Sequence, residues 1–101
     1  MVKSVIWSEE SLLDIESIAE FISRDSVHHA QRIVDEIINV VEILQTQPEM
    51  GRVVPELNLP AIREHFIYSY RIIYEISADQ LHILAVIHGR RLLENVEDRF
   101  S

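Results

Sequence analysis

Four basic side chains in the last third of the chain have the residue types needed to hold an anion. Arg71 lies within one β-prone run, and His88, Arg90 and Arg91 lie at and just beyond the end of the next run. A planar guanidinium makes paired hydrogen bonds with a carboxylate or a phosphate. A histidine, with a reference pKa of about 6.5, exchanges a proton near neutral pH. Arg71, His88, Arg90 and Arg91 are therefore candidates for a local anion site.

The two runs that carry these residues, Tyr70–Ile76 and Leu81–His88, predict a β-hairpin closed by a short turn. With Ser77 paired to Gln80, one face of the hairpin is entirely apolar or aromatic, and we expect the helices to cover it. That face consists of four cross-strand pairs: Ile76 with Leu81, Tyr74 with Ile83, Ile72 with Ala85, and Tyr70 with Ile87. A slip of one residue would mix the two faces, so the alternation sets the register.

The opposite face of the hairpin is expected to present the basic residues. Its cross-strand pairs are Glu75 with His82, Ile73 with Leu84, Arg71 with Val86, and Ser69 with His88. Arg90 follows on the same side, so we expect Arg71, His88 and Arg90 to project together into solvent. A change on a solvent-exposed face usually costs within about 0.5 kcal/mol. Arg71→Ala is therefore expected to reduce function and to leave the fold intact.

Two amphipathic helices are predicted upstream of the hairpin. Val2–Trp7 is a short β-prone run, and Ser8 follows it as a hydroxyl N-cap before two acidic residues of a first helical turn. Asp25 or Ser26 can cap a second helix, which Pro48 ends. The apolar stripes of these helices recur at helical spacing. They consist of Leu12, Ile15, Ile18, Ala19 and Ile22 in the first helix and of Val27, Ala30, Ile33, Val34, Ile37, Ile38, Val41 and Leu44 in the second.

The remaining segments supply the layer that the helices need. A hairpin of two helices cannot bury both stripes alone, so a sheet must cover them. Residues 48–60 indicate a loop, and Ile62–His65 indicates a further strand. The tail predicts a short helix that closes over an edge of the sheet, because its apolar residues have helical spacing: Leu92, Leu93, Val96 and Phe100.

Composition and charge limit the classes of function. The chain has 101 residues, 48% of them hydrophobic, which is enough for one domain with one core. A net charge of −8 disfavours general attraction to nucleic acid. The lack of cysteine fits a reducing compartment, and the lack of a signal-peptide pattern or a long apolar run makes the cytoplasm the expected location. His28-His29 lacks metal-ligand spacing, so we expect neither a metal nor a cofactor.

Seven short features occur in an order that resembles one known family. They are Val5-Ile6-Trp7-Ser8, the two-helix hairpin, Leu44 to Pro48, Gly51-Arg52-Val53-Val54-Pro55-Glu56, Arg63, Tyr70-Arg71-Ile72-Ile73-Tyr74, and Ile87-His88-Gly89-Arg90-Arg91. Together they resemble the RelE/ParE superfamily of toxins from type II toxin–antitoxin systems, over nearly the whole chain. The resemblance implies one α+β domain over residues 1–101. It comprises an N-terminal strand, an αα-hairpin packed on a three- to four-stranded antiparallel sheet, and a short C-terminal helix or tail.

The superfamily divides by mechanism, and the resemblance assigns roles to the candidate residues. RelE-like members are ribosome-dependent mRNA endonucleases, which need a proton acceptor, a charge clamp and a proton donor around one phosphodiester. ParE-like members keep the fold and poison DNA gyrase. Arg71 matches the arginine of the RelE Tyr-Arg strand motif. Arg91, or alternatively Arg90, matches the arginine after the last strand.

Several parts of the nuclease pattern are missing. The lysines that nuclease members place on the preceding strand are replaced by Arg63, Glu64 and His65 within residues 61–66. The C-terminal tyrosine is absent, and His88 departs from the nuclease spacing. The resemblance leaves Arg71, His88 and Arg91 as the candidates for a catalytic role. Because they do not make a complete catalytic set, the chain looks closer to ParE. The residues expected to contact the target or the antitoxin are Arg63, Arg71, His88, Arg90 and Arg91.

Three functions remain open after this comparison. The first is a ParE-like toxin of a plasmid-stabilisation system that binds DNA gyrase. The second is a RelE-like ribosome-dependent mRNA endonuclease, and the third is a non-toxic homologue that only binds its antitoxin. The resemblance also implies a cognate antitoxin whose C-terminal segment wraps the toxin. Because this chain is acidic, we expect that segment to present a hydrophobic strip flanked by Lys or Arg.

Overall fold

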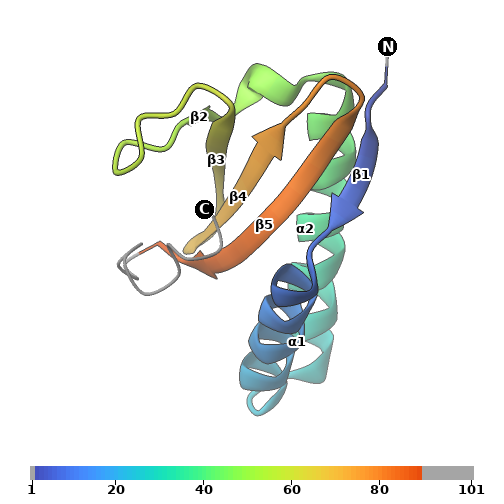
Figure 1. Ribbon diagram of the computed structural model, residues 1–101. Coiled ribbons are helices and arrows are strands. Elements are labelled where there is room, and N and C mark those ends of the chain that lie inside the picture. The colour runs from blue at the N-terminus through green and yellow to red at the C-terminus, as the bar shows by residue number, and fades with distance from the viewer. Residues whose placement is uncertain (1, 90–101) are drawn as a thin grey trace.

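A five-stranded sheet carries two helices on one face (Figure 1), in a computed structural model that describes residues 2–89. The strand order is β1-β5-β4-β3-β2, in which β1 is parallel to β5 and the other neighbours are antiparallel. The elements are β1 Ser4–Trp7, α1 Glu9–Ser23, α2 Val27–Thr46, the 3-10 turn η1 Pro48–Met50, β2 Arg52–Val53, β3 Ile62–Ile67, β4 Tyr70–Ile76 and β5 Gln80–His88. The predicted α+β class is confirmed. The sheet is mixed and has one strand more than expected, because β2 adds an edge beyond β3.

Both helices begin at the caps that the sequence predicts. The Ser8 hydroxyl accepts a hydrogen bond from the Ser11 backbone N–H at 3.0 Å. At the second helix it is Ser26, not Asp25, that caps the chain, by accepting from the His29 N–H at 3.1 Å. α2 ends at Thr46, and a proline then opens the short η1 turn.

The main core lies between the helices and one face of β4 and β5. Its fully or nearly buried members come from both layers: Ile18, Ile33, Ile37, Val41, Leu44, Ile72, Tyr74, Leu81, Ile83 and Val86. The predicted stripes are confirmed except at three members, because Leu12 is 53%, Val27 is 73% and Ile38 is 41% exposed. α1 instead turns Ser11 and Ile18 inward, since these positions lie two turns apart on one side of a helix.

The hairpin register follows the prediction only as far as the middle of β5. Ile76 pairs with Leu81, Glu75 with His82, and Tyr74 with Ile83, as expected. A β-bulge between the pairs Tyr74–Ile83 and Ile73–Ala85 then shifts the register by one residue, so the later predicted pairs are wrong. The observed pairs are Ile73 with Ala85, Ile72 with Val86, Arg71 with Ile87, and Tyr70 with His88. A bulge places two residues opposite one and changes which side chains share a face.

The start of α1 supports the bulge. The Ser8 hydroxyl donates to the Leu84 carbonyl at 3.3 Å, and the Val86 N–H donates to Asp14 Oδ2 at 3.0 Å. The pairing of β1 with β5 ends at Ile83, and the next backbone groups of β5 are bonded by side chains at the start of α1 instead, as buried backbone polar groups require.

A second, smaller core lies on the sheet face opposite the helices. Val54, Ile62, Ile73, Ala85 and Ile87 are buried there, and Leu57 packs against them. The segment between β2 and β3 therefore covers the face that we expected to be exposed to solvent. Arg71 on this face is only 4% exposed, so the prediction of a solvent-exposed Arg71 is wrong.

Two sequence predictions cannot be compared with this fold. Arg90 and Arg91, like the tail with its helical spacing, lie outside the described residues. In the part of the chain that the structure describes, no helix is long and apolar enough to cross a membrane.

Candidate functional site

Arg71 and Glu64 form the centre of a charged network on the sheet face opposite the helices. Antiparallel pairing sets Glu64 opposite Ile73, which places its side chain on the same face as Arg71 on the adjacent strand. Nε of Arg71 donates to Oε1 of Glu64 at 2.9 Å, and Nη2 donates to the same oxygen. Glu64 is 1% exposed. Burying a carboxylate this deeply costs free energy unless cations pair with it.

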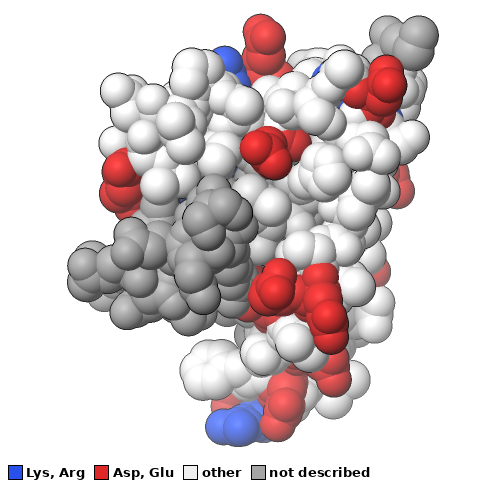
Figure 2. Space-filling model, viewed as in Figure 1, with Lys and Arg blue, Asp and Glu red and all other residues white. Residues whose placement is uncertain are grey.

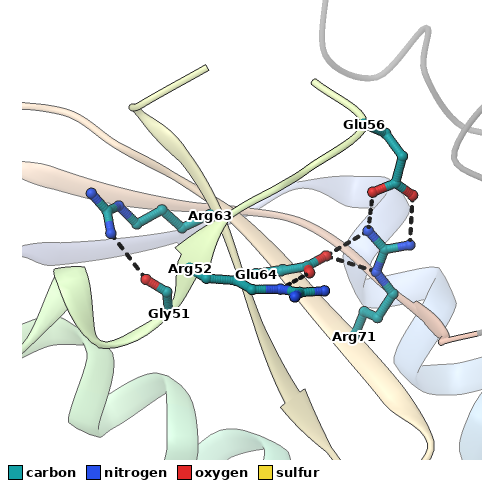
Figure 3. Close-up of polar contacts among 6 residues, drawn as sticks. All are labelled: Gly51, Arg52, Glu56, Arg63, Glu64 and Arg71. Carbon is teal, nitrogen blue, oxygen red and sulfur yellow. Dashed lines mark hydrogen bonds and ion pairs between the residues drawn. The ribbon is translucent and has the colours of Figure 1, made fainter. Parts of the chain in front are cut away.

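Glu56 closes the network from above the sheet. It lies in the segment that follows β2, and its two carboxylate oxygens accept from Nη1 and Nη2 of Arg71 at 3.0 and 3.1 Å (Figure 3). The hydrogen bond from Arg71 lowers the pKa of Glu56 below its usual value, against the opposing effect of burial. Burial by itself lowers the pKa of Arg71, but hydrogen bonds to Glu56 and Glu64 outweigh that effect and leave the pKa raised.

Arg52 is the second cation of this network. Its Nε donates to Oε2 of Glu64 at 2.6 Å, while 63% of its side chain is exposed. The guanidinium carbon of Arg52 lies 5.4 Å from the centroid of the Phe66 ring, within the range of a cation–π contact. One buried carboxylate thus holds two arginines side by side, and the four charges sum to zero.

Arg63 points away from this network, as Figure 3 shows, and does not join Arg71. It pairs with Tyr74 across the sheet, and its Nη1 donates to the Gly51 carbonyl at 3.0 Å. The Tyr74 hydroxyl donates to the Pro48 carbonyl at 2.7 Å and accepts from the Gly51 N–H at 3.0 Å. Burial raises the pKa of Tyr74. Arg63 and Tyr74 therefore hold the turn between η1 and β2.

His88 lies on the opposite side of the sheet from Arg71. The register after the bulge pairs it with Tyr70, and the two rings meet edge to face with centroids 5.9 Å apart. The expected projection of Arg71 and His88 from one face is therefore wrong. The extra residue in β5 turns Ile87, rather than His88, toward the side of Arg71.

The comparison with known families decides the classification. A model of the ParE toxin of the type II toxin–antitoxin system, parDE, matches residues 5–93. The chain belongs to the ParE toxin family. No curated protein matches it at a significant level.

Solved structures share the fold of this ParE-family chain. A chain of the chromosomal ParDE system from P. aeruginosa aligns with a TM-score of 0.72 and 18% identity, covering 86% of this chain and 96% of that one. A chain of the toxin–antitoxin complex RelBE2 from Mycobacterium tuberculosis aligns with a TM-score of 0.66 and 17% identity, covering 87% and 99%. At these identities the likeness concerns the fold alone.

The network of this ParE-family chain includes three residues that sequence reasoning did not select as site residues. Glu56, Glu64 and Arg52 engage Arg71 directly or through a shared carboxylate. A signal for Glu64 was available, because the alternation of β3 places it on the face of Arg71. Glu56 carried no such signal, since its position depends on how residues 54–61 fold back over the sheet.

Proposed function

We propose that this chain is the toxin of a type II toxin–antitoxin pair and that it acts by binding a cellular protein, with DNA gyrase as the target. The support for a contact mechanism is the environment of Arg71. Four of its hydrogen bonds go to Glu56 and Glu64, so an RNA phosphate would have to displace a carboxylate to reach it. A charge clamp for phosphoryl transfer needs donors aimed at the reacting group.

The surface of α1 supports a cognate antitoxin as the second partner. Figure 2 shows acidic side chains gathered over this helix. Leu13 is 55% and Phe21 is 66% exposed on the same helix. Exposed apolar side chains among carboxylates are complementary to an antitoxin segment that presents apolar residues flanked by Lys or Arg. The proposed place of action is the cytoplasm.

Purified gyrase provides the decisive test. Supercoiling of relaxed plasmid should stop at micromolar concentrations of the chain and should resume when the cognate antitoxin is added. Normal supercoiling at those concentrations excludes gyrase as the target. Growth arrest on expression without the antitoxin is also expected, and normal growth would favour a non-toxic homologue that only binds its antitoxin.

The alternative function is a RelE-like ribosome-dependent mRNA endonuclease. The observation that favours it is the position of Arg71 in a Tyr-Arg-hydrophobic strand motif. This alternative predicts cleavage of ribosome-bound transcripts with codon periodicity, which primer extension detects. Intact transcripts during growth arrest would remove it.

A further inference from the structure

The outward edge of the Arg71 guanidinium is a ready-made binding site for a carboxylate, here called the fork. A carboxylate of the same chain, Glu56, occupies it. Glu64 binds Nε and Nη2 of Arg71 from within the sheet and so fixes the plane of the guanidinium. The other edge, Nη1 and Nη2, faces outward and receives the two oxygens of Glu56 at 3.0 and 3.1 Å. This end-on, two-bond geometry is the one in which arginine recognises carboxylates of other molecules.

The two carboxylates that bind Arg71 differ in how easily each can be displaced. Glu64 is completely buried on β3, whereas the Glu56 side chain is 45% exposed. Val54 and Leu57, on either side of Glu56, pack into the second, smaller core. The backbone of this segment is thus held in place while rotation of one side chain can uncover the fork.

Arg52 adds a second cation at the same place. Its Nε is fixed by Glu64, its guanidinium lies over the Phe66 ring, and 63% of its side chain is exposed. Within residues 2–89, Arg52 binds Glu64 through Nε, so its two terminal nitrogens are not used by that carboxylate. When Glu56 swings out, two guanidinium groups face one buried carboxylate, so the local charge changes from zero to +1.

We propose that Arg71 and Arg52, with Phe66 beside them, bind an Asp or Glu side chain of a protein partner, which replaces Glu56. The resident group is a carboxylate, so the geometry already fits this ligand. The net charge of −8 disfavours a polyphosphate chain. A partner with basic flanks toward α1 and one acidic residue at this fork would match both surfaces. The inference concerns binding at this site and holds whatever the cellular target is.

Fluorescence anisotropy with a labelled, capped heptapeptide that carries one central glutamate flanked by lysines tests the proposal on the full chain. Glu56→Gln should raise the affinity for the peptide about tenfold over wild type. In wild type, charge-assisted hydrogen bonds keep Glu56 on Arg71 for most of the time. Only the small fraction of molecules with an open site can bind the peptide, which lowers the apparent affinity. Glu49→Gln is the matched control. Glu49 is an exposed residue of η1 and its replacement changes the net charge equally, so its affinity should stay within twofold of wild type.

Three results would overturn the proposal. Equal gains from Glu56→Gln and Glu49→Gln would reduce the effect to overall charge. If the double variant Glu56→Gln with Arg52→Gln binds the peptide as tightly as Glu56→Gln alone, Arg52 is not part of the site. Tighter binding of a uridine heptanucleotide than of the peptide to Glu56→Gln would assign the fork to phosphate.

A measurement on the wild-type chain covers the case in which the variants do not fold. In a spectrum of ¹⁵N-labelled arginine side chains, the Nε signals of Arg71 and Arg52 should shift on peptide addition, and that of Arg32 on α2 should not. Unmoved Arg71 and Arg52 signals at saturating peptide contradict the proposal. The binding assays contain neither gyrase nor antitoxin, so their failure is separate from a failure of the proposed toxin function.

Discussion

Replacing Arg71 by alanine is expected to destabilise the fold, contrary to the expectation for a solvent-facing residue. The side chain of Arg71 is 5% exposed and that of its partner Glu64 is 0% exposed. Removing one member of a buried ion pair costs about 3–5 kcal/mol, because the remaining charge is left without compensation. Glu64 retains its 2.6 Å bond to Arg52, so we expect the lower end of this range, about 3 kcal/mol.

This loss is large for a domain of this size. Total stabilities of such domains are about 5–15 kcal/mol, and 1 kcal/mol shifts the Tm of a domain of 60–100 residues by about 4–8 °C. Arg71→Ala should therefore lower the Tm by about 12–24 °C. Urea unfolding followed by the fluorescence of Trp7, the single tryptophan, which packs against the main core, measures the change directly.

A second variant and a control separate the buried charge from other effects. Adding Glu64→Gln to Arg71→Ala should restore part of the lost stability, because the amide carries no charge. Arg24→Ala removes an arginine that is 71% exposed and lies 3.8 Å from Glu20, and it should cost less than about 1 kcal/mol. If Arg71→Ala cost no more than Arg24→Ala, the reasoning from burial would be refuted. A loss of toxicity in Arg71→Ala is informative only at matched levels of folded protein.

Three further outcomes follow from the same contacts. The pKa of Glu56 is lower in the folded chain than in the unfolded chain. The contribution of Glu56 to the free energy of unfolding is therefore fully present above its unfolded pKa and is lost as pH falls through its folded pKa. The stability difference between wild type and Glu56→Gln should be constant at neutral pH and should shrink below about pH 4. Tyr74→Phe removes the hydroxyl that bonds Pro48 and Gly51 and should cost about 1–3 kcal/mol in urea unfolding, since the Gly51 N–H loses its partner. Gly51→Ala would set a Cβ 2.6 Å from the Glu64 carbonyl oxygen and should cost about 1–3 kcal/mol; a variant as stable as wild type would contradict the close approach.

Local signals account for the part of the fold that the sequence predicted. A hydroxyl at a helix start, helical spacing of apolar residues and a proline after the last turn each act within a few residues. Ser8 and Ser26 cap their helices as expected, and the turn between β4 and β5 pairs Ser77 with Gln80 through a backbone bond of 3.0 Å. Short residue motifs in a fixed order were also sufficient for the resemblance to the toxin superfamily, which the family match confirms.

Candidate site residues were predicted less well than the elements that carry them. Arg71 was selected and does lie at the centre of a charged network, but its partners Glu56 and Glu64 were not selected. His88 was selected and lies on the other face of the sheet, beside Tyr70. A role for any of these residues in target or antitoxin binding stays a prediction.

Only the tertiary structure decided where the charges meet. The sequence from Leu84 to Ile87 is apolar at every position, so alternation does not distinguish a regular strand from one with a bulge. Contacts from α1 stabilise the bulge. The hydrogen bond between Val86 and Asp14 joins residues that are more than seventy positions apart in the chain. The burial of Arg71 likewise requires the segment after β2 to fold back over the sheet. Types and local spacing of residues therefore determined the elements and the family, whereas long-range packing determined that the arginine is enclosed by two carboxylates.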